Sequence, residues 1–551
     1  MNLTVKQISS LEKIRNIDDI PQRAIEQKTM LGAEVFSYQI VICTDESTCM
    51  SVEIKSPIEE YVKVYKVDRV YMDFPNYNGA SGAQITSESG MMPDLLTPIN
   101  NLNGNLRVCQ NPECLWITVS VPKDFPPGRY PVEIKFSGEQ VNGKRQKFAF
   151  SQIMDIDILG INLPEQKTIF TQWFHTDCIA TAHNVDIYSE EHWSLIDKYM
   201  CLASELGINM ILTPVFTPAL DTGIGKRRPC VQLVGIKKSG NLYEFDFSQL
   251  GRWISLCRKN NIKYLEISHL FSQWGLKYTP NIEAYENGEK KYIFGWHIES
   301  RDESYREFLA QFLPALVSFL KEHDVYEKSY FHLSDEPTAE HLDNYRYAYE
   351  LVRPLIGNRP IMDAISDVNI FESGYMDIPV STTTEIEPFL AKNYDNQWAY
   401  YCSAQHCDVS NRFLSMPSFR NRILGLQLYK YDIKGFLQWG FNFYYSRESQ
   451  YEINPYIDTS AGRGFPSGDS FLVYPGKNEP LPSLRAMIFK EALQEVELCR
   501  LAETYIGRDK VIELIDKEAG GAITFRDYPD NAEFLPEFNE KLKRLIHQMT
   551  I

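Results

Sequence analysis

The chain has 551 residues, of which 44% are hydrophobic, 23% are charged and 13% are aromatic, and its formal net charge is −17. This length allows about two or three domains with sizeable cores. The acidic balance argues against nucleic acid or an anionic membrane surface as a partner, because phosphate binding needs a basic stripe and the sequence shows none. A neutral substrate suits this charge better than a polyanion does.

The N-terminus and the cysteines predict a cytoplasmic protein. Met1 to Gln7 lack the basic region and the following apolar region of a signal peptide, and no apolar run approaches a membrane span in length. The 11 cysteines are scattered, and Cys43, Cys201 and Cys257 lie in apolar runs, as expected for buried, reduced thiols.

Two cysteine pairs have a spacing that zinc sites also use. Four residues separate Cys109 from Cys114, and four separate Cys402 from Cys407. No second pair with histidines accompanies either of them, so we expect no structural metal and no cofactor.

Residues 1–165 are expected to form a β-sandwich. The segments 62–67, 115–121 and 130–136 alternate apolar and polar side chains, as half-buried strands do. No cluster of charged or nucleophilic side chains marks a site in this part of the chain. We therefore interpret it as an accessory domain or as the contact surface of a homodimer.

Residues 166–470 alternate short apolar strands with helical stretches, which predicts an α/β fold with a (β/α)8 TIM-like barrel. The clearest helix covers 302–321, where Tyr305, Phe308 and Phe312 share one face and Pro314 is expected to cause a kink. Short connections late in the barrel leave the number of strands open by one. The expected strands are 168–175, 209–216, 263–270, 329–334, 359–365, 377–383, 397–402 and 435–441.

Residues 471–551 are expected to be a mostly helical region packed on the barrel. One helix is predicted to begin at 482–485, with Phe489 and Val496 on its apolar face. A polar amphipathic helix is predicted over 537–549.

The segment His332-Leu333-Ser334-Asp335-Glu336-Pro337, at the end of an apolar strand, is the strongest candidate for catalysis. Two neighbouring carboxylates raise each other's pKa, so that one of them holds a proton near neutral pH. A protonated acid beside an ionised carboxylate is what cleavage of a glycosidic bond requires. The alternative is structural, because an Asp-Glu pair before a helix also serves as a cap and a first-turn charge.

Polar and aromatic side chains gather at the ends of five of the predicted barrel strands. If the barrel is correct, these ends face one site. Trp and Tyr rings with Asn, Gln and His donors are typical of a sugar subsite, whereas each residue alone could equally pack in the core. The candidate substrate-binding residues are Trp173, His175, Asp177, His269, His332, Tyr400, Tyr401, Gln438, Trp439 and Asn442.

The motif His332–Pro337 resembles the catalytic motif of glycoside hydrolase family 123 and of the wider family called domain of unknown function 4091. Further segments between about residues 170 and 500 are similar to that family, in the same order. They are Trp173-Phe174-His175-Thr176-Asp177-Cys178, Trp398-Ala399-Tyr400-Tyr401-Cys402, Gly435-Phe436-Leu437-Gln438-Trp439-Gly440, the segment 468–476 and Pro482-Ser483-Leu484-Arg485.

The resemblance implies a β-N-acetylgalactosaminidase with a substrate-assisted retaining mechanism. Glu336 would be the general acid/base, and Asp335 would hold the 2-acetamido N–H so that its carbonyl oxygen attacks the anomeric carbon. Adjacent residues cannot easily flank a sugar as acid and separate nucleophile, which agrees with these roles. One departure from the family pattern is Lys490-Glu491-Ala492, where Arg-(Glu/Asp)-Gly is expected.

Other functions remain open at this stage. The same barrel could cleave a sugar that lacks a 2-acetamido group, or the protein could bind carbohydrate without turnover. A metal-dependent hydrolase would need His175, Asp177, His269 and His332 to converge, and their spacing lacks the usual short His motif. A phosphate enzyme is disfavoured, because no Gly-rich phosphate loop is present. A carbohydrate is therefore the expected partner.

Overall fold

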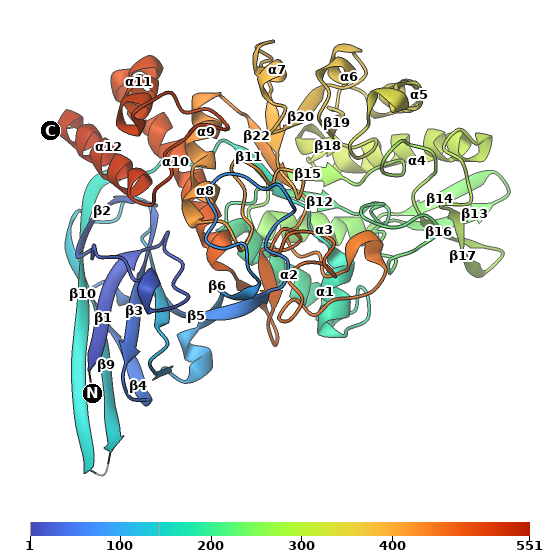
Figure 1. Ribbon diagram of the computed structural model, residues 1–551. Helices are drawn as coiled ribbons and strands as arrows, with labels where there is room; N and C mark the ends of the chain where they lie inside the picture. Colours follow the sequence, from blue (N-terminus) through green and yellow to red (C-terminus); the bar gives the residue numbers. More distant parts are fainter. Residues whose placement is uncertain (1, 143, 551) are drawn as a thin grey trace.

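Two five-stranded sheets form a β-sandwich at the N-terminal end of the computed structural model, which describes residues 2–142 and 144–550 (Figure 1). The strands are β1 (Leu3–Ser9), β2 (Gln27–Gly32), β3 (Val35–Thr44), β4 (Thr48–Lys55), β5 (Val62–Met72), β6 (Gly90–Pro98), β7 (Asn105–Val108), β8 (Glu113–Ser120), β9 (Gly128–Asn142) and β10 (Lys144–Asn162). The sheet orders are β1-β3-β8-β5-β6 and β2-β10-β9-β4-β7.

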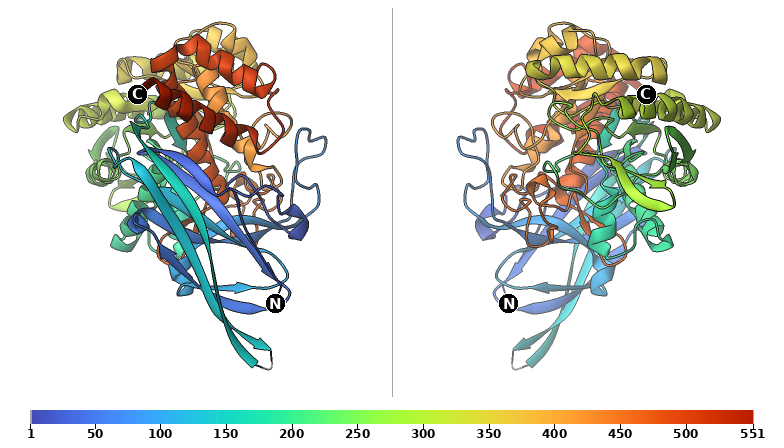
Figure 2. Two further views of the ribbon diagram at one scale, coloured as in Figure 1. Left: turned by 90° about the vertical axis from the view of Figure 1, so that its left-hand side faces the viewer. Right: turned by 90° about the vertical axis from the view of Figure 1, so that its right-hand side faces the viewer.

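Alternation of side chains builds this sandwich. In β5, Val62 and Val64 are buried in the core between the sheets, and Lys63 between them is exposed. Neighbouring strands are antiparallel except β2 and β10, which run parallel. The long β9–β10 hairpin extends away from the rest of the molecule (Figure 2).

Eight parallel strands follow and form a nearly closed barrel, which confirms the predicted fold class. They are β11 (Ile169–Gln172), β12 (Met210–Thr213), β15 (Tyr264–Ile267), β18 (Ser329–Phe331), β19 (Met362–Ile365), β20 (Ile378–Thr382), β21 (Trp398–Tyr400) and β22 (Gly435–Gln438). Their order around the sheet is β18-β15-β12-β11-β22-β21-β20-β19. An isolated bridge between Phe331 and Ile361 joins the two ends of the sheet.

Helices surround the barrel, and further helices form the C-terminal end of the chain. Helix α4 begins after Asp302, whose side chain accepts from Ser304 N, and it buries Tyr305, Phe308 and Phe312 and contains Pro314. The barrel helices are α1 (Thr176–His183), α2 (Glu190–Glu205), α3 (Ser248–Lys259), α4 (Glu303–Glu322), α5 (Leu342–Ile356), α6 (Val368–Glu372), α7 (Glu387–Leu390), α8 (Ser418–Arg422) and α9 (Leu424–Lys430). The C-terminal helices are α10 (Leu484–Ile506), α11 (Arg508–Ala519) and α12 (Phe534–Thr550).

A four-stranded sheet beside the barrel was not anticipated from the sequence. Its strands are β13 (Gly235–Ser239), β14 (Leu242–Asp246), β16 (Ile282–Glu286) and β17 (Glu289–Phe294), in the order β14-β13-β16-β17. They arise from the connections that follow β12 and β15, and in Figure 1 they lie on the side of the barrel away from the sandwich. A short hairpin, β23 (Val473–Pro475) with β24 (Pro480–Pro482), precedes α10.

The sandwich contacts the barrel through a buried ion pair and through one long segment. Asp94 in β6 accepts from Arg485 Nε at 2.8 Å at the start of α10. The segment 73–89, drawn in blue, reaches over the barrel (Figure 1), where the Tyr77 hydroxyl donates to the Gly464 carbonyl at 3.1 Å. The Asn76 side chain donates to the His406 carbonyl nearby.

The 11 cysteines are free thiols. Cys43 and Cys257 are buried as expected, but Cys201 is exposed, because α2 turns it toward solvent. Within residues 2–142 and 144–550, no helix is both long enough and apolar enough to cross a membrane.

Candidate active site

The segment 332–336 leaves the end of β18 and continues beside the chain that follows β15. Leu270 N donates to the His332 carbonyl at 3.1 Å, Phe271 N donates to the Leu333 carbonyl at 3.0 Å, and Trp274 N donates to the Asp335 carbonyl at 3.2 Å. These bonds hold the backbone of the segment that carries both carboxylates.

Glu336 has an unusual backbone conformation. Its φ is 45°, in the left-handed region that few residues other than glycine adopt. Such strain persists only where the surroundings hold it, and it concentrates at functional sites. The Tyr400 hydroxyl, at the end of β21, donates to Glu336 Oε1 at 2.6 Å and holds the half-buried carboxylate in place.

Asp335 and Glu336 share one charged environment. Burial and the neighbouring charges of Glu336 and Asp363 raise the pKa of Asp335 well above its usual value of 3.8, and His332 opposes this. Asp335 therefore holds a proton more readily than an isolated aspartate does. Asp221, in the loop after β12, also acts on Asp335, and burial raises the pKa of Asp221 to about 6.

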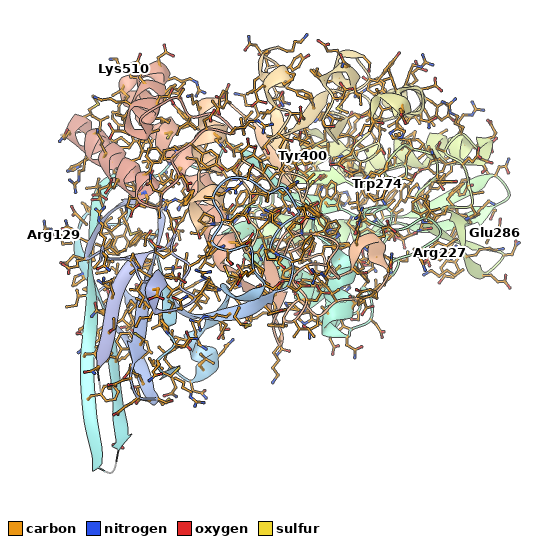
Figure 3. The ribbon with its side chains drawn as sticks, viewed as in Figure 1. Arg129, Arg227, Trp274, Glu286, Tyr400 and Lys510 are labelled. Carbon is orange, nitrogen blue, oxygen red and sulfur yellow. The ribbon has the colours of Figure 1, made fainter. Side chains whose placement is uncertain are left out.

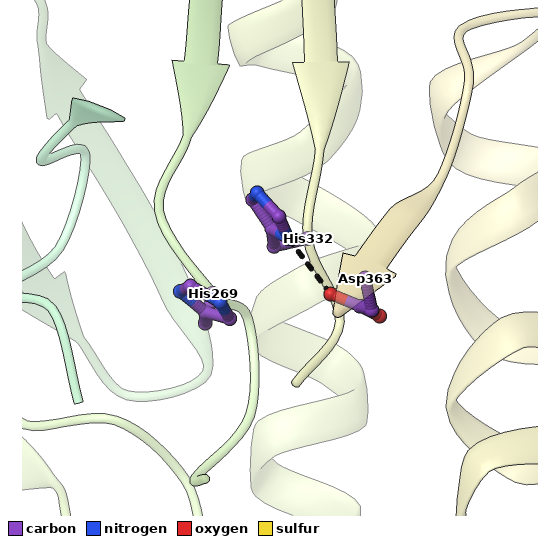
Figure 4. Close-up of side chains that lie close together, drawn as sticks. All are labelled: His269, His332 and Asp363. Carbon is purple, nitrogen blue, oxygen red and sulfur yellow. Dashed lines mark hydrogen bonds and ion pairs between the residues drawn. The ribbon is translucent and has the colours of Figure 1, made fainter. Parts of the chain in front are cut away.

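His332 lies between two fully buried carboxylates, Glu266 and Asp363, and Figure 4 shows its contact with Asp363. Its Nδ1 lies 2.8 Å from Asp363 Oδ1 in β19, and its Nε2 lies 2.7 Å from Glu266 Oε1 in β15. Although burial lowers the pKa of His332, its hydrogen bonds and charge interactions with Asp363 and Glu266 raise it to about 10.

His269 stacks on His332 with 4.4 Å between ring centroids. Burial, with the charge of His332, lowers the pKa of His269 well below 6.5 and keeps the ring neutral. Neither ring nitrogen has a hydrogen-bond partner among the described residues. His269, His332 and Asp363 place donor atoms within 4.8 Å of one another, but both nitrogens of His332 already face carboxylates, so the three do not form an open set of metal ligands (Figure 4).

Trp173 is buried and packs against His269 and His332. Its ring is buried and packs edge-on against His269 at 5.3 Å and His332 at 6.2 Å between centroids. Its Nε1 donates to Glu266 Oε1 at 2.7 Å. Trp173 therefore belongs to the buried floor beneath the two acids.

His175, Asp177 and Asn442 lie in a separate buried network. Arg228 makes two bonds to the Asp177 carboxylate, at 2.6 and 2.7 Å, and approaches His175 Nδ1 at 3.1 Å. Asn442 exchanges two hydrogen bonds with the backbone of His175. Burial and the Arg228 charge lower the pKa of His175 to about 3, which keeps the ring neutral. Because the Arg228 guanidinium donates to Nδ1, Nε2 carries the proton and donates to the Trp439 carbonyl at 2.9 Å. The structure places this network behind Trp439.

Gln438 and Trp439 both bind Asp469, which lies in the loop after β22. The Trp439 Nε1 donates to Asp469 Oδ2 at 2.9 Å, and the fully buried Gln438 amide donates to Oδ1 at 3.2 Å. Burial raises the pKa of Asp469 to about 6 despite the nearby Arg412. Trp439 itself remains half-buried and can present ring surface to a ligand.

Tyr400 and Tyr401 point to opposite sides of β21 and the loop that follows. Tyr400 reaches Glu336, whereas the Tyr401 hydroxyl donates to Asn421 Oδ1 and its ring packs against Phe436 at 5.0 Å between centroids. The structure thus places Tyr401 in the core outside the barrel, apart from the acid pair.

Three further residues at this site were absent from the predicted set. Glu266 and Asp363 bind His332, and Trp274, 45% exposed, lies in the loop beside Asp335. Figure 3 shows Trp274 and Tyr400 over the barrel, far from Arg129 on the sandwich. A carboxylate inside an apolar strand, as in Leu265-Glu266-Ile267 or Met362-Asp363-Ala364, is the signal that could have identified the first two.

Comparisons with known proteins show what the chain is similar to. The sequence matches the family model "Glycoside hydrolase 123, catalytic domain" over residues 173–502. A solved family 123 glycoside hydrolase from Clostridium perfringens superposes with a TM-score of 0.73 at 15% identity and covers 99% of this chain and 98% of its own, which shows a shared fold. A family 5 mannosidase from Rhizomucor miehei aligns with 60% of this chain and 92% of its own at 11% identity, with a TM-score of 0.32. No curated protein sequence matches the chain.

Proposed function

The chain belongs to glycoside hydrolase family 123, and we propose that it is a retaining exo-β-N-acetylgalactosaminidase or a closely related β-N-acetylhexosaminidase. The adjacent carboxylates of Asp335 and Glu336 at the mouth of β18 carry this proposal. The similar enzyme from Clostridium perfringens is described as hydrolysing glycolipid glycans, which supports a glycan as the substrate here.

The proposed reaction uses the sugar's own 2-acetamido group as the nucleophile. Glu336 protonates the glycosidic oxygen as its bond to the anomeric carbon breaks, and the acetamido carbonyl oxygen forms the new bond to that carbon. Asp335 accepts the hydrogen bond of the acetamido N–H and stabilises the oxazolinium ion. Water then attacks the anomeric carbon and gives its proton to Glu336, which restores the acetamido group and retains the configuration.

Adjacent residues suit this division of work. Consecutive Cα atoms are about 3.8 Å apart, whereas an acid and a protein nucleophile must flank the sugar from opposite sides. Asp335 and Glu336 emerge together from one strand end, so both carboxylates approach the sugar from the same direction. A nucleophile supplied by the substrate removes the need for a carboxylate on the far side.

Aromatic rings near the pair are proposed to bind the sugar. Trp439 is half-buried and Trp274 is exposed, so both can stack on the apolar face of a pyranose ring. The unpartnered nitrogens of His269 are proposed to bind a sugar hydroxyl. His175, Asp177, Gln438 and Asn442 are proposed to act through Trp439, which they support from behind.

Hydrolysis of matched glycosides tests the proposal. The 4-nitrophenyl β-glycosides of N-acetylgalactosamine, N-acetylglucosamine and galactose are compared for wild type, Asp335→Asn and Glu336→Gln. We expect turnover of an acetamido sugar only, and a loss of about 10²- to 10⁴-fold in both variants. Glu340→Gln is the matched control, because this exposed glutamate lies four residues beyond Glu336.

The leaving group separates the two roles. Nitrophenolate departs without protonation, so Glu336→Gln should lose more activity on a disaccharide than on a nitrophenyl glycoside. Asp335→Asn should lose activity on the two substrates by the same factor. A thiazoline that mimics the cyclised intermediate should bind far more tightly than substrate. Turnover of plain galactoside without thiazoline inhibition would overturn the substrate-assisted mechanism, and retained sugar binding without any turnover would indicate a carbohydrate-binding protein.

A further inference from the structure

The two carboxylates around His332 also accept hydrogen bonds from other N–H groups. Asp363 accepts from the backbone N–H groups of Leu333, at 3.2 Å, and Ser334, at 3.3 Å, in addition to His332. Glu266 accepts from the indole N–H of Trp173 at 2.7 Å. Backbone and indole N–H groups can only donate, so both carboxylates act as acceptors in these contacts.

The protonation state of His332 follows from its two partners. A neutral imidazole has one N–H and could donate to only one carboxylate, leaving its other nitrogen lone pair against an anion. His332 faces Asp363 through Nδ1 and Glu266 through Nε2, and the imidazolium cation can donate to both carboxylates at once. The neutral His269 ring stacked on it, and the Tyr345 hydroxyl that donates to Asp363 Oδ2 at 2.7 Å, add no charge.

We propose that His332 is a positioning residue: as an imidazolium cation between Glu266 and Asp363, it anchors residues 333–336 and supplies the positive charge that lets Asp335 ionise beside Glu336. The inference rests on the proposed function, since it concerns how the polarising carboxylate of that reaction is prepared. It assigns a role to three buried residues that do not touch the substrate.

Anchoring runs through the carboxylate of Asp363. The Leu333 and Ser334 N–H groups bind this carboxylate instead of a neighbouring strand. Its position depends on His332, because the ion pair determines where the fully buried charge of Asp363 is stable. Loss of His332 therefore releases the start of the catalytic segment as well as its charge.

The electrostatic role follows from the charges that face Asp335. Burial and the carboxylates of Glu336, Asp363 and Asp221 favour its protonated form, and His332 favours the ionised form. The proposed reaction needs Asp335 ionised to accept the acetamido N–H while Glu336 holds the proton. His332 thus favours the ionised form of Asp335 that the proposed reaction needs.

Activity as a function of pH tests this role. His332→Gln and Asp363→Asn are compared with wild type on the acetamido glycoside. We expect kcat to fall roughly 10²-fold, as a small misplacement of a reacting group produces, with KM changed far less. The acidic limb of the pH–rate profile should move about one unit to higher pH in His332→Gln, because Asp335 loses its opposite charge.

The matched control is His192→Gln, which removes another fully buried histidine of the barrel, whose ring nitrogens contact the Tyr188 N–H and the Thr176 carbonyl. It should leave the position of the acidic limb unchanged. An unshifted limb in a folded His332→Gln variant would overturn the electrostatic role, and a limb that shifts equally in His192→Gln would show a general loss of packing.

Nuclear magnetic resonance of the imidazole nitrogens decides the charge independently of activity. In wild type, both His332 nitrogens should stay protonated from pH 6 to about 9, because its pKa is raised to about 10. Titration of His332 near pH 6.5 would refute the inference. A charged His332 in a protein that hydrolyses no acetamido sugar would instead refute the proposed function alone.

Discussion

The Tyr400 hydroxyl donates a hydrogen bond of 2.6 Å to Oε1 of Glu336. This contact occupies one oxygen of the proposed general acid and leaves Oε2 to carry the proton to the glycosidic oxygen. It also joins two barrel strands, because Tyr400 ends β21 and Glu336 follows β18.

Tyr400→Phe removes this hydrogen bond and keeps the aromatic ring. We expect kcat to fall about tenfold, since a hydrogen bond to a charged group contributes about 1.5–3 kcal/mol and solvent replaces part of it. KM should change little. Tyr401→Phe, which removes the neighbouring hydroxyl on the far side, should leave both parameters unchanged. Equal losses in the two variants would contradict a role for the Tyr400 contact.

Asp335→Asn should stabilise the protein at neutral pH. The pKa of Asp335 is raised above 3.8 in the folded state, so its ionisation costs folding free energy once the pH exceeds that value. The cost is absent below about pH 4 and grows as the pH rises toward the folded pKa. Thermal unfolding should therefore give a higher Tm for Asp335→Asn than for wild type at pH 7, and the difference should shrink at pH 4.5. A constant difference would point to packing instead.

The backbone at Glu336 offers a comparison in which only a Cβ changes. Glu336→Ala and Glu336→Gly both lose the carboxylate, but at a φ of 45° the alanine keeps the strain that glycine avoids. We expect the glycine variant to be more stable by about 1 kcal/mol. Denaturant unfolding of the two proteins measures this difference, and an alanine variant of equal or greater stability would show that the conformation costs little.

The Asp94–Arg485 ion pair should hold the sandwich on the helical region. Both side chains are buried, and Asp94 also accepts from the Tyr474 hydroxyl at 2.6 Å. Asp94→Ala leaves a buried, uncompensated guanidinium and should cost about 3–5 kcal/mol of unfolding free energy. Glu537→Ala, which breaks the exposed pair with Arg23, should cost less than about 1 kcal/mol. Similar losses in both variants would contradict the difference expected from burial.

The barrel could be predicted because its strands are short apolar runs that recur between helices, and each predicted strand contains an observed one. The sheet β14-β13-β16-β17 could not, because its strands carry Lys237, Lys238, Lys290 and Lys291 and resemble loops in composition. Lysines suit strands that are only partly covered.

The acid pair was predictable from its residues, but the partners of the surrounding residues were not. Sequence places His175 and Asp177 at a strand end, and only the fold brings Arg228 to them from a loop 51 residues further on than Asp177. Likewise, the alternation of side chains along β21 decides that Tyr400 faces Glu336 and that Tyr401 faces the core. A local pattern can predict that a residue lies at a strand end. It cannot predict which residue from a distant segment will contact it.

The bridge between Phe331 and Ile361 closes the barrel beside the strand that carries the acid pair. Beyond this bridge, no backbone ladder continues from β18 to β19 among the described residues. Instead, the Asp363 carboxylate in β19 accepts hydrogen bonds from the Leu333 and Ser334 N–H groups. A side chain thus completes the hydrogen bonding between the two end strands of the barrel sheet, next to the proposed catalytic pair. Amide hydrogen exchange at Leu333 and Ser334 consequently reports on one carboxylate, so a single pair of resonances can monitor whether the ring of strands is open or closed.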